Sequence, residues 1–545
     1  MTRSPSPDSV PDLQRLRSLT TRADPADGSA DSADDRDSIT VRDPATATVI
    51  GTVPAGTPAD VTTAVSRARE AQQSWAERPV AERAAVLSRY HDRVLSHRGE
   101  LLDLMQLESG KARQDAFEEL LDVATNARYY ANEGPGLLTS ERRRGAFPLL
   151  TKTVTHRHPV GVVGVISPWN YPLTLAVSDA LPALLAGNAV VLKPDEHTPF
   201  TALRAVELLR EAGLPDDLFQ VVTGHGPDLG EPLISSVDFL QFTGSSEVGR
   251  TVAAQVGEHL IDCSLELGGK NPMLVLPDAD VSAAAAGAVR GSFTTAGQLC
   301  ISFERIYVHE SVFDEFCESF VERTRNLTLG ASFDYGPDVG SMLSAEQVEK
   351  TERHVEDAVA EGATLLTGGR RREDLGPHFF EPTVLTDVPD SATLSDEETF
   401  GPVAAVYEVS STDEAVARAN DSEYGLNAAV WTEDTAVGES VARRVDCGTV
   451  NVNEAFAATW ASVDAPMGGM DDSGLGRRHG EHGLTKFTES QTVSTQRLVP
   501  IETPDRVPGW LWERFMTANL HSLKRVAGLR SRLRDLAGRL PGGGR

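Results

Sequence analysis

Two short segments about thirty residues apart place a carboxylate and a thiol beside small residues. The first is Glu266-Leu-Gly-Gly-Lys-Asn-Pro272, and the second is Gly297-Gln-Leu-Cys300. Glycines next to both groups allow backbone and ligand to approach closely. A cysteine thiolate can attack a carbonyl carbon, and a nearby carboxylate can later deprotonate water to release the acyl group. The two segments therefore indicate covalent acyl chemistry.

The length and composition are those of a large globular protein. The chain has 545 residues, 40% of them hydrophobic, which is enough for two or three domains with a sizeable core. It contains no run of about eighteen apolar residues, so no membrane-spanning helix is predicted. The amino terminus lacks the apolar region of a signal peptide, and we therefore expect a cytoplasmic protein.

The chain is strongly acidic, with 80 Asp and Glu against 51 Lys and Arg and a formal net charge of −29. Such a surface would repel phosphates, so nucleic acid is excluded as a partner. This excess of negative charge is compatible with an ordinary soluble protein. The composition nevertheless favours adaptation to high salt, where dissolved ions screen the repulsion between the negative charges.

Four cysteines are present, and only one lies in a setting that suggests chemistry. They are Cys263, Cys300, Cys317 and Cys447. None forms a CxxC pair and no Cys/His cluster has zinc-ligand spacing, so neither a metal site nor a disulfide framework is predicted. Cys300 alone lies in a glycine-rich segment downstream of a carboxylate motif.

Strands and helices that could position these groups alternate from residue 160 onward. Buried strands are predicted at 160–166, 188–192, 218–222, 239–242 and 263–267, with helices at 173–186, 200–212 and 247–256 between them. Short apolar strands separated by helices indicate a parallel sheet covered on both faces. The layout is α/β, doubly wound and typical of nucleotide binding. A second α/β region follows from about 275 to 470.

The two ends of the chain differ from this centre. Residues 1–38 are rich in Ser, Asp and Pro and are predicted to form a disordered acidic arm. Helical patterns follow at 60–76, 82–109 and 111–132, and a strand or hairpin is predicted at 151–158. Residues 506–545 carry nine basic and two acidic side chains, a net charge of +7. Apolar residues at helical spacing there predict a helix that packs on the protein's own acidic surface or binds a membrane surface or a partner.

A glycine-rich segment follows the predicted strand at 239–242. It reads Phe242-Thr-Gly-Ser-Ser-Glu-Val-Gly249. Gly244 permits a tight turn, and Ser245 with the helix N-terminus can bind a pyrophosphate. The glycine spacing differs from the usual dinucleotide fingerprint, so an ordinary turn is the alternative.

Polar residues also follow the first two strands of the sheet. Lys193 and Glu196 follow the second strand and could hold a ribose diol, with a surface salt bridge as the alternative. Asn170, in Ser167-Pro-Trp-Asn-Tyr-Pro172, follows the first strand and can donate to a developing oxyanion.

Together these motifs resemble those of the NAD(P)-dependent aldehyde dehydrogenases. Further matches are Glu397-Glu-Thr-Phe-Gly-Pro402, Gly448-Thr-Val-Asn-Val-Asn453 and Pro466-Met-Gly-Gly-Met-Asp-Asp-Ser-Gly474, and the resemblance covers residues 40–495. It implies two doubly wound parallel-sheet domains plus a small β hairpin for oligomerisation, in a homodimer or homotetramer. We expect an NAD-binding domain at 39–267, interrupted by a bridging hairpin near 145–160, and a catalytic domain at 268–470. Residues 471–500 are then expected to return to the cofactor domain and to form the oligomerisation strand, and residues 501–545 to form a basic amphipathic tail.

The resemblance also implies a role for each motif. Cys300 would be the nucleophile, Asn170 and the Cys300 N–H the oxyanion site, and Glu266 the base that activates water. The expected cofactor-binding residues are Trp169, Lys193, Glu196, Gly244, Ser245, Gly249, Leu267, Glu398 and Phe400. A carboxylate at Glu196 would accept hydrogen bonds from the ribose hydroxyls of NAD and repel the 2′-phosphate of NADP. NAD is therefore the expected cofactor, with NADP as the alternative.

The substrate is the least specified part of the resemblance. Segments 166–195, 297–308 and 465–480 are similar to a succinate-semialdehyde dehydrogenase branch. However, residues 173–179 contain no arginine for a substrate carboxylate, and Arg305, Arg477 or Arg478 would have to serve. Other or broader aliphatic aldehydes remain the alternative. Glu266 argues against a CoA-acylating enzyme, and the presence of all three reactive residues argues against an inactive structural or binding homologue.

Overall fold

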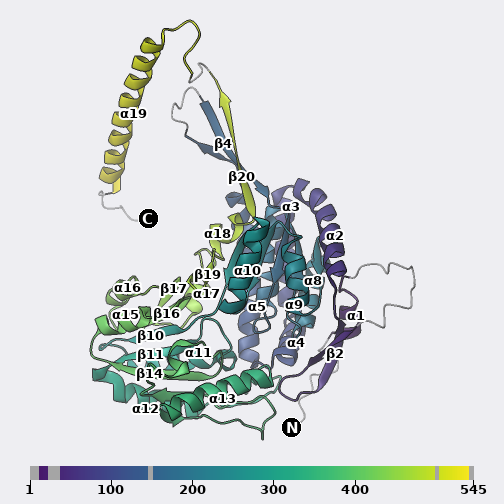
Figure 1. Cartoon of the computed structure of the whole chain (residues 1–545), viewed down its shortest axis with the longest axis vertical. Helices are drawn as coiled ribbons and strands as arrows, with labels where there is room; N and C mark the ends of the chain where they lie inside the picture. Colours follow the sequence, from purple (N-terminus) through teal and green to yellow (C-terminus); the bar gives the residue numbers. More distant parts are fainter. Residues whose placement is uncertain (1–10, 22–36, 145–150, 498–501, 539–545) are drawn as a thin grey trace, which may run out of the picture. The chain divides into compact units, whose positions relative to one another are not determined.

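The computed structural model describes residues 11–21, 37–144, 151–497 and 502–538 (Figure 1). It contains two compact units, Met1–Leu138 with His158–Glu489 and Thr139–Arg157 with Ser490–Arg545. Both sheets that surround the reactive residues belong to the first unit. Among the described residues, no helix is long and apolar enough to cross a membrane.

The first sheet has six strands in the order β19-β9-β8-β5-β6-β7. They are β5 (Val162–Ile166), β6 (Ala189–Lys193), β7 (Phe219–Val221), β8 (Phe239–Thr243), β9 (Asp262–Glu266) and β19 (Gly474–Leu475). Five run parallel, and β19 pairs with β9 antiparallel. All five residues of β6 are buried, because a parallel sheet with both faces covered shields every side chain.

Helices from two parts of the chain cover this sheet. α2 (Pro58–Glu77) and α9 (Gly226–Ile234) pack against each other and on β5, and α10 (Ser246–His259) continues this group. α7 (Ala180–Ala186) packs on β5 and β6 and contacts α3 (Val80–Ser96) and α5 (Arg113–Leu137), and α8 (Pro199–Glu211) packs against α3. α4 (Arg98–Ser109) contacts α5 and α8. The expected doubly wound architecture is confirmed for this sheet.

The second sheet has seven strands in the order β12-β13-β14-β11-β10-β16-β17. They are β10 (Asn271–Val275), β11 (Phe303–His309), β12 (Thr364–Thr367), β13 (Thr383–Thr386), β14 (Val403–Val409), β16 (Asn427–Trp431) and β17 (Thr449–Val452). Only β12 is antiparallel. Its helices include α11 (Val281–Phe293), α12 (Phe313–Arg325), α13 (Ala345–Ala360), α15 (Thr412–Asn420) and α16 (Thr435–Ala442). Four residues, 267–270, join β9 to β10, so Glu266 lies where the chain passes from one sheet to the other.

The second unit holds a three-stranded sheet and the C-terminal helix. The sheet has the order β20-β4-β3, from β3 (Glu141–Arg143), β4 (Thr151–Pro159) and β20 (Thr488–Gln496). The tail forms α19 (Gly509–Gly538), as its periodicity predicts, and Trp510, Phe515 and Leu520 on it are more than half exposed. Residues 145–150 of the expected bridging hairpin lie outside the described residues.

The prediction of disorder over residues 1–38 is wrong for residues 11–21. α1 (Leu13–Arg17) begins after Asp12, whose side chain accepts hydrogen bonds from two backbone N–H groups, and Leu16 is fully buried. The N–H of Thr21 then donates to the carbonyl of Val221 at 2.8 Å. The apolar spacing of Leu13, Leu16 and Leu19 was the missed signal. Residues 1–10 and 22–36 of the arm lie outside the described residues.

Two predicted helices are interrupted. The pattern at 173–186 divides into α6 (Thr174–Val177) and α7, because Pro182 has no N–H to donate to the carbonyl of Ser178. The pattern at 82–109 divides into α3 and α4 at His97, whose φ of −100° and ψ of 18° are not helical. The first break places Ser178 and Asp179 between two short helices near Glu266.

Candidate active site

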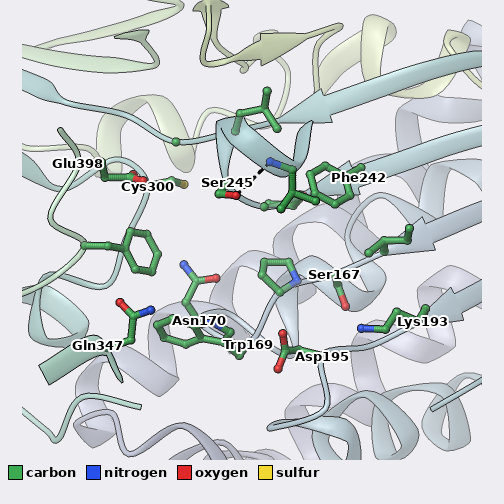
Figure 2. Close-up of a pocket in the computed structure, with 18 of the residues that line it drawn as sticks. Ser167, Trp169, Asn170, Lys193, Asp195, Phe242, Ser245, Cys300, Gln347 and Glu398 are labelled. Atoms are coloured by element: carbon green, nitrogen blue, oxygen red, sulfur yellow. Dashed lines mark hydrogen bonds between the residues drawn. The ribbon is translucent and has the colours of Figure 1, made fainter. Parts of the chain in front are cut away.

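A cleft of about 390 Å³ lies at the carboxyl ends of β5, β6 and β8 (Figure 2). The order of strands reverses between β5 and β8, and ligands of parallel sheets bind at such a reversal. Loops of the second sheet complete its wall. The lining comprises Ile166, Ser167, Pro168, Trp169, Asn170, Lys193, Asp195, Phe242, Thr243, Gly244, Ser245, Val248, Leu267, Gly268, Cys300, Gln347, Lys350, Glu398 and Phe400.

Cys300 reaches the cleft from a tight turn that follows α11. Gly297 and the two residues before it have φ of 70°, 54° and 53°, all in the left-handed region. A Cβ on Gly297 would lie 2.0 Å from the carbonyl oxygen of Gly401, so only glycine fits there. Asn271 Nδ2 then donates to the carbonyl of Cys300 at 2.8 Å. The thiol is therefore carried by a constrained segment.

Glu266 is the last residue of β9 and is buried, with 6% of the residue exposed. Among the described residues, its Oε1 has no hydrogen-bond partner. Burial raises the pKa of Glu266 to about 7, while the positive charges of Arg478 and Lys486 lower it and the charge of Asp179 raises it. A carboxylate that titrates near neutral pH has the properties of a general base.

Asn170 is buried in the loop between β5 and α6. Its Nδ2 donates to the carbonyl of Gln298 at 3.1 Å, two residues before Cys300 in the chain. The amide nitrogen carries two hydrogens, and this bond uses one of them. The side chain therefore connects the loop after β5 to the turn that carries the thiol. Asn170, Cys300 and Glu398 face the same space in Figure 2.

The Cys300 thiol is protonated at neutral pH in this structure. Burial raises its pKa to about 12, and the carboxylates of Glu398 and Glu266 contribute in the same direction, while Arg478 lowers it. The thiolate is the nucleophilic form of cysteine. A proton acceptor is therefore needed before Cys300 can attack, and Glu266 is close enough to affect the thiol electrostatically.

Seven of the nine residues expected to bind the cofactor line the cleft. They are Trp169, Lys193, Gly244, Ser245, Leu267, Glu398 and Phe400. Ser245 is the N-cap of α10, where its hydroxyl accepts from the N–H of Val248. Glu398 Oε1 accepts from the N–H of Gly269 at 2.9 Å, and burial raises the pKa of Glu398 to about 7.

Glu196 and Gly249 do not line the cleft. The carboxylate of Glu196 lies 3.5 Å from Lys193 Nζ and 3.3 Å from His225 Nδ1, so its nearest contacts are side chains. A Cβ on Gly249 would lie 2.4 Å from a methyl group of Leu267, so this glycine allows α10 to pack closely on the strand end. Their contribution to cofactor binding remains a prediction.

The cleft fits a nicotinamide dinucleotide. The N-terminus of α10 offers backbone N–H groups and a positive dipole for a pyrophosphate. A Cβ on Gly244 would meet the ring of Phe242 at 2.5 Å, so a larger residue in this turn would require that ring to move. Lys193 Nζ and the Glu398 carboxylate are suited to hold the two riboses. Bound there, the nicotinamide would supply a hydride acceptor beside Cys300.

Five polar residues of the cleft were not predicted from the sequence. Ser167, Asp195 and Thr243 belong to segments that the sequence pattern singles out, but the predicted roles there fall on other residues. Gln347 and Lys350 lie on α13, more than forty residues after Cys300, and no local signal connects them with the site. Lys350 Nζ donates to the carbonyl of Glu398 at 2.7 Å and so fixes that loop.

A buried charge network lies near Glu266. Asp179 Oδ1 lies 3.1 Å from Lys486 Nζ, and its Oδ2 lies 2.9 Å from Arg478 Nε. Lys486 Nζ also donates to the hydroxyl of Ser264 at 3.1 Å. Ser264 and Glu266 are two residues apart on β9 and therefore point to the same face. The network can thus set the ionisation of Glu266.

Comparison with known proteins gives one consistent result. A sequence model of the Aldehyde dehydrogenase family matches residues 31–493. A protein of Mycolicibacterium smegmatis named "Putative succinate-semialdehyde dehydrogenase", with NADP(+) in its name, is 49% identical over 96% of this chain and 100% of its own. The crystal structure of succinate-semialdehyde dehydrogenase from Burkholderia pseudomallei matches with a TM-score of 0.84 and 34% identity over 90% of this chain and 100% of that chain. Betaine aldehyde dehydrogenase from Staphylococcus aureus in complex with NAD+ matches with a TM-score of 0.82 and 33% identity over 90% and 99% of the two chains.

Proposed function

We propose that this chain, which belongs to the aldehyde dehydrogenase family, oxidises succinate semialdehyde to succinate with NAD as the hydride acceptor. The family identifies it as an oxidoreductase that acts on aldehydes with NAD(P). The residue roles, the substrate and the preference for NAD are the proposal. The observation that carries it is that the thiol of Cys300 and the amide of Asn170 line one cleft, while Glu266, a buried carboxylate with a pKa of about 7, lies close enough to raise the pKa of Cys300.

The first half of the reaction forms a thioester on Cys300. Glu266 accepts the thiol proton, and the sulfur attacks the aldehyde carbon. The resulting oxyanion accepts hydrogen bonds from Asn170 Nδ2 and the N–H of Cys300. A nicotinamide bound in the cleft would accept the hydride from this carbon, which would leave the thioester on Cys300. Because Asn170 also bonds to the carbonyl of Gln298, its amide is already oriented before the aldehyde enters.

The second half hydrolyses the thioester. Glu266, ionised again, removes a proton from water, and the hydroxide attacks the acyl carbon. Collapse of the tetrahedral intermediate releases the carboxylic acid and the Cys300 sulfur. A CoA-acylating enzyme would use an external thiol in place of water and would not need this base. Glu266 therefore supports a hydrolytic enzyme.

The names of similar proteins support succinate semialdehyde, and the structure reduces the choice of an arginine for its carboxylate. Arg305 donates to backbone carbonyls, including that of Lys270 at 2.8 Å. Arg477 donates to the carbonyls of Gly469 and Gly476. Arg478 is the remaining candidate, because its Nη2 has no hydrogen-bond partner among the described residues.

A second candidate substrate is an aldehyde without a carboxylate. Arg478 is already compensated, since it interacts with the charges of Asp179, Asp122 and Glu266. Together with Lys486, these residues comprise three carboxylates and two cations. This balance of charge disfavours binding of a substrate carboxylate. The NAD+-bound betaine aldehyde dehydrogenase, similar in fold, is named for a cationic aldehyde.

The proposed preference for NAD rests on Glu196. Its carboxylate lies beside Lys193, which lines the cleft at the end of β6 where the adenosine ribose would bind, and the negative charge would oppose a 2′-phosphate there. Lys193 and His225 offset part of this charge. The name of the mycobacterial relative specifies NADP(+), so both cofactors must be compared directly.

The test is the rate of reduced nicotinamide formation with three aldehydes of similar size. Succinate semialdehyde, butyraldehyde and 4-aminobutyraldehyde differ in the charge at the far end of the chain. The proposal predicts the highest kcat/KM for succinate semialdehyde with NAD. A higher value for either of the other aldehydes would replace the substrate assignment and leave the chemistry at Cys300 intact.

A further inference from the structure

Two lysine–glutamate pairs are buried beside the cleft without lining it. Lys111 and Glu119 are both 0% exposed at their side chains, and Lys270 and Glu304 are 0% and 2% exposed. Removing two charges from water costs several kcal/mol per ion before their attraction offsets it, and apolar replacements are often equally stable. Stability alone therefore does not account for either pair.

The first pair contacts the loop that contains Asn170. Lys111 Nζ, which forms an ion pair with Glu119, donates to the backbone carbonyl of Asn170 at 2.7 Å. The ammonium group also lies 4.0 Å from the centre of the Tyr171 ring. Glu119 Oε2 accepts from the backbone N–H groups of Leu173 and Thr174 at 2.9 and 3.2 Å. The pair thus holds both ends of the segment 170–174.

The second pair contacts the loop that contains Glu398 in the same way. Lys270 Nζ lies 2.5 Å from Glu304 Oε2 and donates to the backbone carbonyl of Glu397 at 2.7 Å. Glu304 accepts from the backbone N–H groups of Thr399 and Phe400 at 2.9 Å. Phe400 has a φ of 57°, a left-handed conformation that is costly for a large side chain and must be held by its surroundings.

The two loops meet at the cleft. The rings of Trp169 and Phe400 contact each other edge to face, with centroids 5.5 Å apart. Asn170 lies next to Trp169 and Glu398 lies two residues before Phe400, and all four line the cleft with Cys300. Each loop is therefore fixed on its buried side by one ion pair and exposes its functional side chains to the cleft.

We propose that Lys111–Glu119 and Lys270–Glu304 are positioning pairs with separate tasks, the first orienting Asn170 for attack on the carbonyl and the second orienting Glu398 and Phe400 for the cofactor. The proposal rests on the proposed function of Asn170, Glu398 and Phe400. In each pair the lysine holds a loop carbonyl, and the glutamate holds loop N–H groups that would otherwise be buried without an acceptor.

Two measurements separate the tasks. Hydrolysis of p-nitrophenyl acetate needs Cys300 and the oxyanion site but no cofactor, since the sulfur displaces p-nitrophenolate and water then releases acetate. Cofactor binding, followed by quenching of tryptophan fluorescence, needs no aldehyde. Neither readout depends on succinate semialdehyde as the substrate, so failure of the substrate assignment would not affect them.

Lys111→Met is expected to reduce ester hydrolysis at least tenfold and to change the dissociation constant of NAD less than twofold. Lys270→Met is expected to do the opposite, raising the dissociation constant at least tenfold with ester hydrolysis within twofold. The matched control is Arg204→Met, which removes a buried cation that pairs with Glu100 and Glu207 away from the cleft. It should alter neither readout.

The conservative variants Glu119→Gln and Glu304→Gln keep an acceptor for the loop N–H groups and serve if the methionine variants do not fold. Glu119→Gln should mainly reduce ester hydrolysis and Glu304→Gln should mainly weaken NAD binding, with smaller changes than those of the methionine variants. The proposal is overturned if the folded variants of both pairs impair ester hydrolysis and NAD binding together, or if they behave like the Arg204→Met control. It is also overturned if each variant affects the readout assigned to the other pair.

Discussion

Replacing Lys486 with methionine should move the pH dependence of turnover to higher pH. Glu266 acts as a base in its ionised form, so activity is present above its pKa and is lost as the pH falls through it. The pKa of Glu266 is about 7, and the charge of Lys486 is one of the interactions that lower it. Lys486→Met removes that charge, so the pKa of Glu266 must rise.

The size of the change follows from the position of Lys486. It is bonded to Ser264, two residues from Glu266, and two residues of a strand span about 7 Å. A unit charge at that distance contributes about 2.4 kcal/mol at an effective dielectric constant near 20. Because Asp179 offsets part of the charge, we expect about half of this, which is close to one pH unit. Near pH 7 the ionised fraction of Glu266 then falls from about one half to about one tenth.

The assay is kcat against pH, with saturating aldehyde and NAD, together with the rate of acyl-enzyme hydrolysis in single turnovers. Lys486→Met should be about fivefold slower than the wild type near pH 7 and approach it in alkaline buffer. Lys486→Arg keeps the charge and should keep the wild-type profile. Asp179→Asn removes a charge that raises the pKa of Glu266 and should move the profile to lower pH. Identical profiles for Lys486→Met, Asp179→Asn and the wild type would refute this account of the network.

Three further predictions concern the oxyanion site, the cofactor and the surface charge. Asn170→Ala should lower kcat and ester hydrolysis about 100-fold, the usual cost of losing one oxyanion donor, with the dissociation constant of NAD unchanged; an effect confined to cofactor binding would contradict the assigned role. Glu196→Ser should raise the ratio of kcat/KM for NADP to that for NAD about tenfold, equivalent to about 1.4 kcal/mol, because it removes the charge that opposes a 2′-phosphate. A wild-type enzyme that already prefers NADP would show that Glu196 does not select the cofactor. The net charge of −29 predicts a higher Tm and greater activity in molar KCl than in dilute buffer, and a lower Tm in KCl would reject the salt adaptation.

The sequence was sufficient for the parts of the site that are locally encoded. Each buried strand of the first sheet is a short apolar segment bounded by turns. Lys193 is the last residue of β6, and Asn170 and Ser245 come shortly after the ends of β5 and β8. In a parallel sheet these positions converge at one edge, so a linear pattern predicts a three-dimensional cluster. Glu266 and Cys300 were identified from their glycine-rich neighbours in the same way.

The parts that were missed depend on contacts between distant segments. Asp179 and Lys486 are 307 residues apart, and their bond is visible only once the segment that ends at Lys486 packs against α7. Gln347 and Lys350 reach the cleft from a helix of the second sheet. A charged residue in an apolar helix resembles a surface position in the sequence, so the burial of Glu119 gave no local signal.

The contacts of Glu196 show another limit. The sequence placed it correctly at the carboxyl end of β6, but the direction of a side chain depends on its neighbours. His225 comes from the segment before α9, and together with Lys193 it engages the carboxylate. The structure thus places the Glu196 carboxylate beside Lys193 and adds a contact with His225, a residue outside the sequence motif.

The most direct test of the account is a rapid-mixing experiment on Glu266→Gln with saturating NAD and succinate semialdehyde. This variant keeps Cys300 and the cleft but removes the base that activates water for hydrolysis of the thioester. Because Glu266 also accepts the thiol proton, the account predicts a burst that is slower than in the wild type but still approaches one reduced nicotinamide per subunit. It also predicts steady turnover slowed by about 100-fold or more and a succinyl group on the peptide that contains Cys300. Steady turnover at the wild-type rate, or product formation without any acyl group on Cys300, would contradict it.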